Sequence, residues 1–219
     1  GERIWFVNLV DVITIGNLFL EGRYNSEKII ALTGEEVKSP CYYKVRRGVS
    51  IKNLIKDNVN TEDHLRFISG NVLTGTRINE DGFLGAFDNQ LTVIKEGDYK
   101  EGLGWLKLGL KKFSFSHTFL SGFCINHRKR PFVIDSNIHG SKRAYVFTGE
   151  FEKVLPMDVY PMQLIKACIT KDIDKMEELG IYEVDSEDFA LCEVIDVSKT
   201  DIQDIIRSGL ELMRKEMGE

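Results

Sequence analysis

The sequence predicts an α+β protein with a front part of short strands and one short helix, a strand-rich middle and a helical end. Short apolar runs that end at glycines lie between residues 28 and 70, a pattern typical of buried strands. Frequent glycines separate further short β-type runs from residue 82 to residue 149. After Pro156 the apolar residues recur at the helical spacing of three and four positions.

The first element is a helix expected over residues 7–21. Asn8 is a good N-cap, and Asp11 falls in the first turn, near the positive end of the helix dipole. Val7 and Val12 have the spacing of a hydrophobic staple. The glycine at position 22 is a suitable C-terminal stop.

The next elements form a small mixed module. Strands are expected at residues 28–34, 41–45 and 65–69, with a short helix at residues 51–56 before the third strand. This order of strand, strand, short helix and strand is typical of a β-grasp, the ubiquitin-like fold. We therefore expect a β-grasp near the front of the chain.

The middle of the chain contains an aromatic segment. Its alternation of period two places Phe113, Phe115, His117 and Phe119 on one face of an expected strand and hydroxyl groups on the other. His117 is interpreted as a half-buried strand histidine, or alternatively as a donor to a quinone oxygen. Four strands are expected in this region: residues 91–95, 112–119, 131–135 and 144–148.

The end of the chain is helical. Pro161 suits the first turn of one helix, and residues 172–179 form a second helix that stops at Gly180. Thr200 and Gln203 have the spacing of a capping box for the last helix. The apolar stripe of that helix is interpreted as core or partner-helix contact. Its members are Ile202, Ile205, Ile206, Leu210, Met213 and Met217.

Length and composition limit the class of protein. The 219 residues predict one or two domains with enough chain for a buried core. The 29 Lys and Arg against 34 Asp and Glu give a formal charge of -5, which argues against a nucleic-acid binder. No apolar run reaches the roughly 20 residues that span a bilayer, and the start has no signal-peptide pattern. Because no initiator Met is present, we expect a fragment of a longer chain.

No sequence motif for a nucleotide, a metal or a nucleophile is complete. Residues 70–76 have the glycine spacing of a phosphate loop without its lysine, and residues 102–105 hold a GxG without the third glycine. The four histidines are isolated, and Cys124 with His127 cannot complete a four-ligand metal set. The four cysteines form no CxxC pair, so reduced thiols are expected. The basic patch at residues 127–130 is interpreted as a solvated turn, or as a contact for anionic lipid headgroups or an acidic partner.

Several segments resemble known respiratory proteins. Residues 7–11 resemble the segment that leads out of the flavin domain in the NADH-binding subunit of complex I. Residues 33–55 resemble the soluble-ligand-binding β-grasp (SLBB) domain of those proteins, with Cys41 where glycine is common. Residues 68–76, with residues 155–158 and 188–193, resemble the A subunits of the sodium-translocating NADH:quinone reductases.

The likeness to these A subunits covers essentially the whole chain and implies their C-terminal half. The implied domains are the end of a degenerate flavin-domain-like region (1–27), an SLBB-type β-grasp (28–96), a strand-rich connecting region (97–149) and a C-terminal helical domain (150–219).

Relatives of this architecture, including the C subunit of the Rnf complex, bind iron–sulfur clusters through the frame C-x2-C-x2-C-x3-C-P, present twice. Aligning Pro161 with the first proline places Glu150, Lys153, Pro156 and Tyr160 at the ligand positions. The second set of positions is Ser186, Phe189, Cys192 and Asp196. One thiolate, Cys192, cannot hold a cubane cluster, which takes about four. The resemblance therefore implies a ferredoxin-type insert without clusters, in which Cys192 is a vestigial position.

The resemblance implies a subunit of a respiratory sodium pump that couples NADH oxidation and ubiquinone reduction to Na⁺ export. This chain would have no catalytic, cofactor or metal residues of its own, while other subunits use NADH, flavins, iron–sulfur centres and ubiquinone. It would scaffold or cover the quinone-reducing site and dock on the other subunits, especially a membrane subunit, at the cytoplasmic face of the bacterial inner membrane. Phe113, Phe115, His117 and Phe119 are the candidate quinone or partner surface. The alternative is a stand-alone β-grasp module that binds a small soluble ligand.

Overall fold

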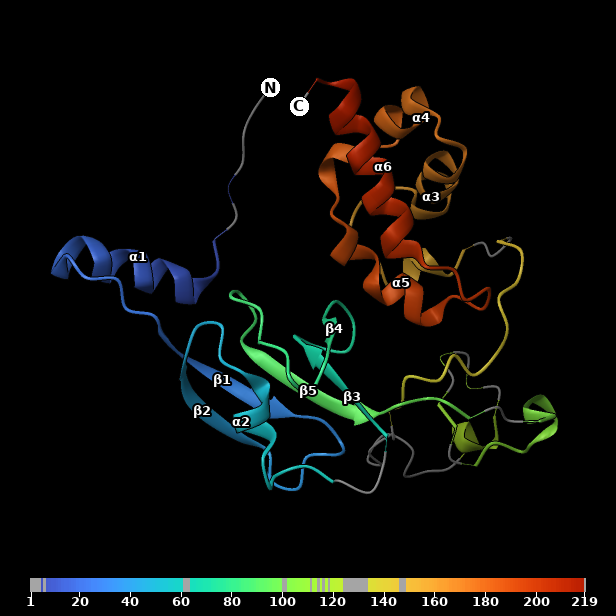
Figure 1. Ribbon diagram of the computed structural model, residues 1–219. Coiled ribbons are helices and arrows are strands. Elements are labelled where there is room, and N and C mark those ends of the chain that lie inside the picture. Colours follow the sequence, from blue (N-terminus) through green and yellow to red (C-terminus); the bar gives the residue numbers. More distant parts are fainter. Residues whose placement is uncertain are drawn as a thin grey trace. The chain divides into compact units, whose positions relative to one another are not determined.

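The protein is described by a computed structural model, and its chain divides into two compact units (Figure 1). Unit 1 comprises residues 1–96 and 133–136, and unit 2 comprises residues 97–132 and 137–219. The structure describes residues 5, 7–60, 64–99, 102–110, 112–113, 115, 117, 119–123, 134–145 and 149–218.

Unit 1 is built on a five-stranded mixed sheet. Its strand order is β2-β1-β5-β3-β4, with β1 and β5 parallel and every other neighbouring pair antiparallel. A hairpin, a short helix and a final strand that returns beside the first strand form the predicted β-grasp arrangement. The strands are β1 (Glu27–Thr33), β2 (Cys41–Arg46), β3 (Leu65–Ser69), β4 (Thr76–Ile78) and β5 (Gln90–Lys95).

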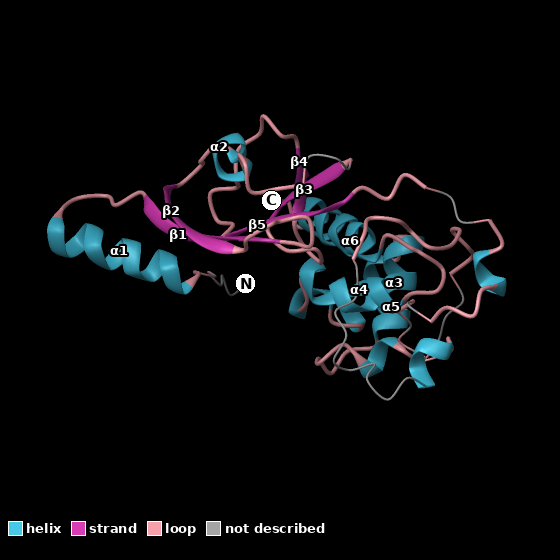
Figure 2. Cartoon of the chain, turned by 90° about the horizontal axis from the view of Figure 1, so that it is seen from below, coloured by secondary structure: helices cyan, strands magenta, loops and turns pink. Residues whose placement is uncertain are grey.

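One face of this sheet carries the core of unit 1. Ile30 and Leu32 in β1 are fully buried, whereas the intervening Ile29 is 64% exposed, as the alternation along a strand requires. Helix α2 (Ile51–Ile55) covers the buried face, as Figure 2 shows, with Leu54 turned inward. Each fully buried Ile or Leu side chain contributes roughly 2 kcal/mol of transfer free energy.

Strand β4 was not predicted. Its three residues, Thr76, Arg77 and Ile78, contain a single apolar side chain, so they show no alternation. The antiparallel pairing with β3, in which Phe67 lies opposite Ile78, makes this segment a strand.

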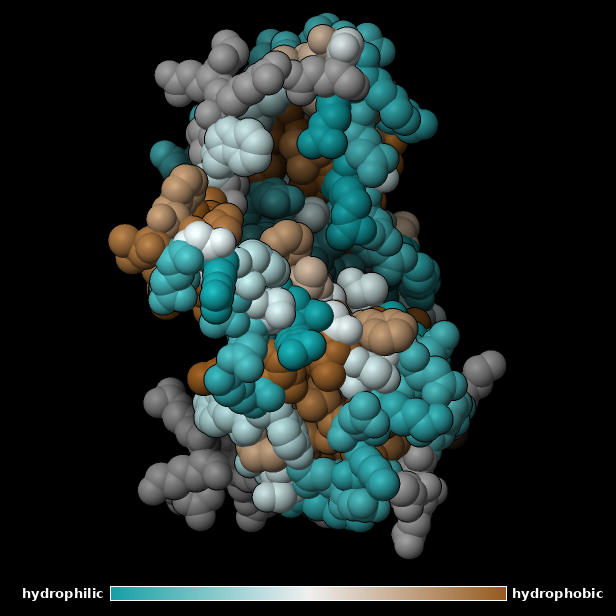
Figure 3. Space-filling model, turned by 60° about the vertical axis from the view of Figure 1, so that its left-hand side comes forward, coloured by the Kyte–Doolittle hydropathy of each residue, from teal (hydrophilic) through white to brown (hydrophobic). Residues whose placement is uncertain are grey.

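Helix α1 (Leu9–Glu21) confirms the first predicted element. Gly22 closes it in the left-handed conformation, with φ of 66°, and Asp11 lies in the first turn. The Asn8 side chain makes no capping hydrogen bond, and Val7 and Val12 stay about half exposed. No residue of α1 is buried, and Figure 3 shows hydrophobic side chains, in brown, at its surface.

Unit 2 is held together by helices packed around one apolar core. The core draws on α3, α4, α6 and the short turns between them. Leu164 and Ile165 of α3 face Ile202 and Ile206 of α6, and all four are fully buried. The helices are α3 (Pro161–Thr170), α4 (Ile173–Glu178), α5 (Ala190–Ile195) and α6 (Ile202–Glu216), with 3-10 turns η4 (Phe151–Lys153), η5 (Ile181–Glu183) and η6 (Ser186–Phe189).

Most of the predicted helix boundaries in unit 2 are confirmed. Pro161 occupies the first turn of α3, and Gly180 ends the second helix in the left-handed conformation with φ of 83°. The capping box of Thr200 and Gln203 is wrong. The N-cap of α6 is Asp201, and the Gln203 amide donates instead to the Glu193 carboxylate.

The strand-rich middle is also a wrong prediction for the residues that the structure describes. Of the four expected strands, the one at residues 91–95 is confirmed as β5 in the sheet of unit 1, whereas residues 112, 113, 115, 117 and 119 are not in a strand. The described part of residues 97–149 holds the 3-10 turns η1 (Gly104–Leu106) and η2 (Leu120–Phe123) and irregular backbone. Gly109 and His117 have φ of 64° and 53°, which an extended strand does not accommodate.

Two other strands predicted in this region receive no support. Asp135 makes an isolated bridge with Lys95, and residues 144 and 145 are not in a strand; residues 131–133 and 146–148 lie outside the described residues. Within the described part of the chain, none of the helices has both the length and the apolarity to cross a bilayer.

Candidate functional site

The aromatic residues predicted to share one strand face are arranged differently. Phe113 and Phe115 are 56% and 44% exposed, and His117 is exposed with a left-handed backbone. Phe119 is turned partly inward. The four residues therefore belong to one folded loop but do not form a flat face.

Lys112 organises this loop. Its backbone N–H donates to the Gly109 carbonyl at 3.1 Å, and its own carbonyl accepts from the Ser121 hydroxyl at 2.6 Å. Its ammonium lies 5.9 Å from the centre of the Phe119 ring, a cation–π contact. A Cβ atom at Gly109 would lie 2.5 Å from that ring, so the turn at Gly109 is shaped around Phe119.

The first set of predicted cluster-frame positions lies mainly on the surface of unit 2. Glu150 and Lys153 pair with each other, Nζ to Oε1 at 2.6 Å, across η4. Pro156 is exposed, and Tyr160 is 67% exposed. Their side chains are therefore engaged with each other or with solvent.

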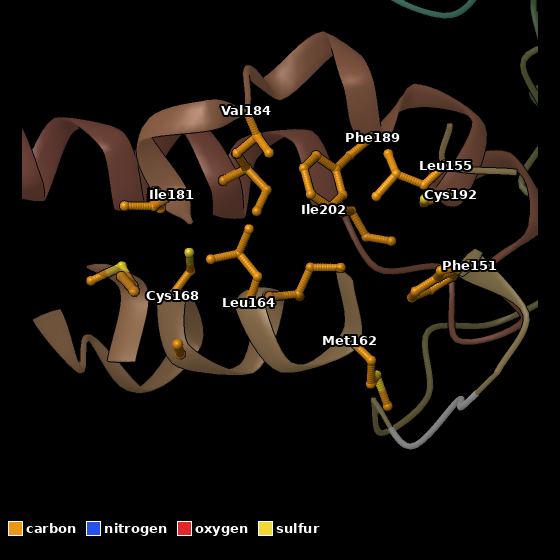
Figure 4. Close-up of a cluster of buried hydrophobic side chains, with 14 of the residues drawn as sticks. Phe151, Leu155, Met162, Leu164, Cys168, Ile181, Val184, Phe189, Cys192 and Ile202 are labelled. Carbon is orange, nitrogen blue, oxygen red and sulfur yellow. The ribbon is translucent and has the colours of Figure 1, made fainter. Parts of the chain in front are cut away.

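The second set lies deeper. Phe189 and Cys192 are fully buried and project into the same interior as Phe151, Leu155 and Ile202, as Figure 4 shows. Apolar packing fills the space that these two side chains enter.

The two buried cysteines of unit 2 are in a poor state to bind a metal. Burial raises the pKa of the Cys192 thiol to about 12, and the nearby Glu152 carboxylate adds to this effect. Burial alone raises the pKa of the Cys168 thiol to about 11. Metal ligation and nucleophilic attack both require the thiolate, which these surroundings disfavour.

Asp196 is the best-defined polar group of the frame. Its side chain is fully buried, and its two carboxylate oxygens accept from the backbone N–H groups of Ser198 at 3.0 Å and Thr200 at 2.8 Å. Its own N–H donates to the Cys192 carbonyl at 3.0 Å. The carboxylate thus joins the end of α5 to the start of α6.

A neighbouring segment is tied to the same loop. The Arg143 N–H donates to the Ser198 carbonyl at 2.9 Å, and the Ser198 hydroxyl donates to the Ala144 carbonyl at 3.1 Å. Tyr145 follows, with its ring stacked on Phe151 at 6.2 Å between centroids. Its buried hydroxyl has no hydrogen-bond partner among the described residues, and burial raises its pKa.

These residues do not fit an iron–sulfur cluster. Phe189 offers no ligand atom, Cys192 sits as a protonated thiol in the core, and Asp196 already accepts two backbone hydrogen bonds. Among the described residues, no three His, Cys, Asp or Glu side chains are grouped so that they could hold a metal ion. At these aligned positions, Phe189 and Cys192 pack in the core and Asp196 closes a loop.

Each unit also has a surface hollow. In unit 1 a groove of about 820 Å³ is lined by the end of α2, β3 and β4, with Asn53, Asn60 and Asn79 among its polar groups. In unit 2 a cavity of about 440 Å³ lies between α3, α6 and the Asp196 loop. Its basic groups are Lys142, Arg143 and Lys199, and the Lys142 ammonium pairs with Asp201 at 2.6 Å.

Comparison with known proteins identifies relatives of the chain. The chain is 39% identical over 217 residues to the A subunit of the Na(+)-translocating NADH-quinone reductase of Rhodopirellula baltica, and 38% identical over 217 residues to that of Klebsiella pneumoniae. The corresponding protein of Psychromonas ingrahamii is 37% identical over 216 residues. The chain is related over nearly its whole length to the A subunits of the Na(+)-translocating NADH-quinone reductases.

Two facts qualify the extent of the match. The alignments cover 98–99% of this chain but 47–48% of the relatives, so the chain spans about half the length of the A subunits that it matches. A family model described as NQRA_SLBB, NQRA C-terminal domain, matches residues 29–80. That range runs from within β1 to just after β4 and includes α2, so the predicted presence of an SLBB domain is confirmed.

Sequence reasoning missed the most strongly shifted carboxylate of unit 1. Glu96, just after β5, accepts from both Nε and Nη2 of Arg66 and from the Ser136 hydroxyl at 2.7 Å, and it forms an ion pair with Arg77 at 3.2 Å. The Arg66 hydrogen bonds are the main cause that holds its pKa at about 2. The pairing of β5 with β3 and of β3 with β4 brings the two arginines to Glu96, and the bridge between Lys95 and Asp135 brings Ser136, so no local sequence signal marks this group.

A buried lysine was missed as well. The Lys28 ammonium donates to the backbone carbonyls of Gly85 at 3.4 Å, Ala86 at 3.0 Å and Asp88. Burial lowers its pKa, with the Arg47 charge as a further cause. This side chain fixes the loop before β5 to the first strand, a structural role.

Proposed function

We propose that this chain forms the C-terminal half of the A subunit in a respiratory sodium pump that couples NADH oxidation and ubiquinone reduction to Na⁺ export. The observation that carries this proposal is the end-to-end similarity to such A subunits at 37–39% identity. The SLBB-type module at residues 29–80 supports it independently.

The chain has no redox centre of its own in this proposal. Support comes from the second cluster frame, in which Phe189 and Cys192 pack in the core and Asp196 closes a loop. NADH, flavins, iron–sulfur centres and ubiquinone are then handled through other subunits. The helical unit keeps the packing of a ferredoxin-type insert without its metals.

The role of the chain is to scaffold or cover the quinone-reducing site and to dock on other subunits, above all a membrane subunit. It acts as a peripheral protein at the cytoplasmic face of the bacterial inner membrane. The exposed Phe113 and Phe115, together with His117 and Phe119, supply the surface for the quinone or partner. An aromatic and imidazole surface suits a quinone ring, which stacks on apolar groups and accepts hydrogen bonds at its oxygens.

The absence of a redox centre is tested by reconstitution. The chain is incubated with iron and sulfide under reducing conditions, beside a four-cysteine ferredoxin as a positive control. We expect visible absorbance in the ferredoxin only. A stable chromophore with stoichiometric iron in this chain would refute the cluster-free assignment.

The place in the complex is tested by assembly. The pump is assembled with and without the polypeptide that carries this chain, and NADH oxidation with an artificial acceptor is compared with quinone reduction and Na⁺ uptake. We expect quinone reduction and Na⁺ uptake to require this polypeptide. Full quinone-linked pumping without it would refute the proposal.

The aromatic surface is tested within that complex by photolabelling with a quinone analogue. Phe113→Ala with Phe115→Ala is expected to reduce labelling of the chain, whereas Phe87→Ala, which alters a 71% exposed ring in unit 1, leaves it unchanged. Labels confined to other segments would rule out the quinone role of these residues.

A second candidate is a stand-alone β-grasp module that binds a small soluble ligand. The groove of about 820 Å³ in unit 1 favours it, because it combines asparagine side chains with the apolar edge of the core. Affinity capture that recovers no other pump subunit, together with ligand-induced thermal stabilisation of the chain, would support this candidate. Capture of a membrane subunit would exclude it.

A further inference from the structure

The charges of this chain are segregated along the sequence. The 33 residues from Gly102 to Ile134 contain six of the 29 basic residues and none of the 34 acidic ones. The rest of the chain therefore has 23 basic against 34 acidic side chains. A strongly basic segment in an acidic protein indicates a surface for an anionic partner.

The described part of the same segment exposes large apolar side chains. Leu103, Leu106, Leu108 and Leu110 are 65%, 61%, 68% and 58% exposed, and Phe113 is 56% exposed. Single exposed leucines are ordinary, but a run of them within eleven residues marks an interaction surface. Lys107 is exposed between Leu106 and Leu108, so one cationic group lies within the apolar run.

The loop is folded so that the leucines stay outside. The Leu120 N–H donates to the Leu108 carbonyl at 3.1 Å, and the Lys112 ammonium donates to the Gly104 carbonyl at 3.3 Å. These contacts are made by the backbone of the leucine run and leave its side chains at the surface.

We propose that residues 103–110, 112 and 113 belong to a membrane-contact loop that rests on the surface of an anionic phospholipid bilayer. Its leucines and Phe113 enter the boundary between headgroups and acyl chains, and the exposed Lys107 attracts the phosphate groups. Leucine, phenylalanine and lysine without acidic residues are the composition of interfacial membrane anchors, which combine apolar insertion with attraction to anionic lipid.

The basic charge of the loop favours an anionic bilayer as its binding partner. An anionic headgroup layer presents phosphate at every position, so it matches a basic loop without requiring complementary shape. Membrane spanning is not involved, because the loop is short and irregular. This inference does not depend on the proposed function, since a bilayer can bind the chain without any other subunit.

The test is binding of the full chain to vesicles, measured by co-sedimentation. Vesicles of phosphatidylcholine alone are compared with vesicles that also contain phosphatidylglycerol, at low and high salt. We expect binding to the anionic vesicles that weakens as salt rises, because salt screens the lysines.

Matched variants separate the loop from the rest of the chain. Leu106→Glu with Leu108→Glu is expected to lower the partition constant by at least about tenfold, whereas Leu191→Glu with Val194→Glu on exposed sites of α5 leaves it unchanged. Lys107→Glu is expected to lower it by roughly fivefold or more. Circular dichroism checks that each variant keeps its helical content.

Three results would overturn the inference. The first is no binding to anionic vesicles at low salt, and the second is equal binding by the loop variant and the α5 variant. The third is a loop variant that binds vesicles as the unchanged chain does but that another pump protein no longer captures in detergent. That result would assign the loop to a protein interface. If the loop variant kept its vesicle binding while the complex still reduced quinone, only the inference of a membrane-contact loop would be refuted. The proposed function would stand.

Discussion

Replacement of Asp196 by Asn tests how the loop between α5 and α6 is held. The wild-type carboxylate is fully buried and accepts from the N–H groups of Ser198 and Thr200. In the variant, the amide oxygen can accept one of these bonds. The amide NH₂ then faces the other N–H, so one bond is lost and one buried donor is left without an acceptor.

The expected cost follows from these two bonds. A hydrogen bond to a charged group contributes about 1.5–3 kcal/mol, and a buried unsatisfied donor costs about 1–3 kcal/mol. The neutral amide is cheaper to bury than the carboxylate, which offsets part of the loss. We therefore expect Asp196→Asn to lower the free energy of unfolding by about 2–3 kcal/mol, and Asp196→Ala by more.

The assay is urea unfolding at neutral pH, followed by circular dichroism at a helical wavelength. Asp204→Asn is the control, because that carboxylate is 72% exposed and pairs with Arg207 on the surface of α6. Its expected cost is below about 0.5 kcal/mol. A change of the same small size in Asp196→Asn would refute the role assigned to the buried carboxylate.

Three further changes have defined outcomes. The pKa of about 2 at Glu96, against an ordinary 4.5, corresponds to about 3 kcal/mol of stability that is present above pH 4.5 and lost as the pH falls toward 2. Glu96→Gln should therefore lower stability at neutral pH and flatten the acid limb of the pH–stability curve, and an unchanged acid limb would contradict this. A thiol reagent should label the partly exposed Cys41 in the folded protein and Cys192 only on unfolding, as peptide mapping would show; rapid native labelling of Cys192 would contradict its burial. Gly209→Ala should destabilise unit 2 by about 1–2 kcal/mol despite the better helix propensity of Ala, because its Cβ would lie 2.7 Å from the Cys168 sulfur; a stabilised variant by thermal unfolding would show that the cysteine moves aside.

Local patterns predicted most of the regular elements. The alternation in β1, the run that forms β3 and the proline that opens α3 all act through neighbours in the chain, so their signals are readable without the fold. The boundary of α6 was missed because the Gln203 amide binds Glu193, a residue ten positions earlier on another helix.

In the middle of the chain, by contrast, the local pattern predicted a strand that does not form among the described residues. Residues 112–119 alternate as a strand does, yet a strand forms only if a second strand supplies hydrogen-bond partners. Here Lys112 and Ser121 close a loop, and the left-handed backbone at His117 turns the chain. Periodicity alone cannot report whether such a partner exists.

For the candidate site, the residues at the eight positions aligned by resemblance predict that one thiolate is too few to bind a cluster. They do not predict which contacts the side chains at these positions make. The buried carboxylate of Asp196 bonds two backbone N–H groups, and Phe189 fills the core beside Cys192. The sequence determines which side chains these positions carry, whereas their contacts depend on groups that only folding brings within hydrogen-bond and van der Waals reach.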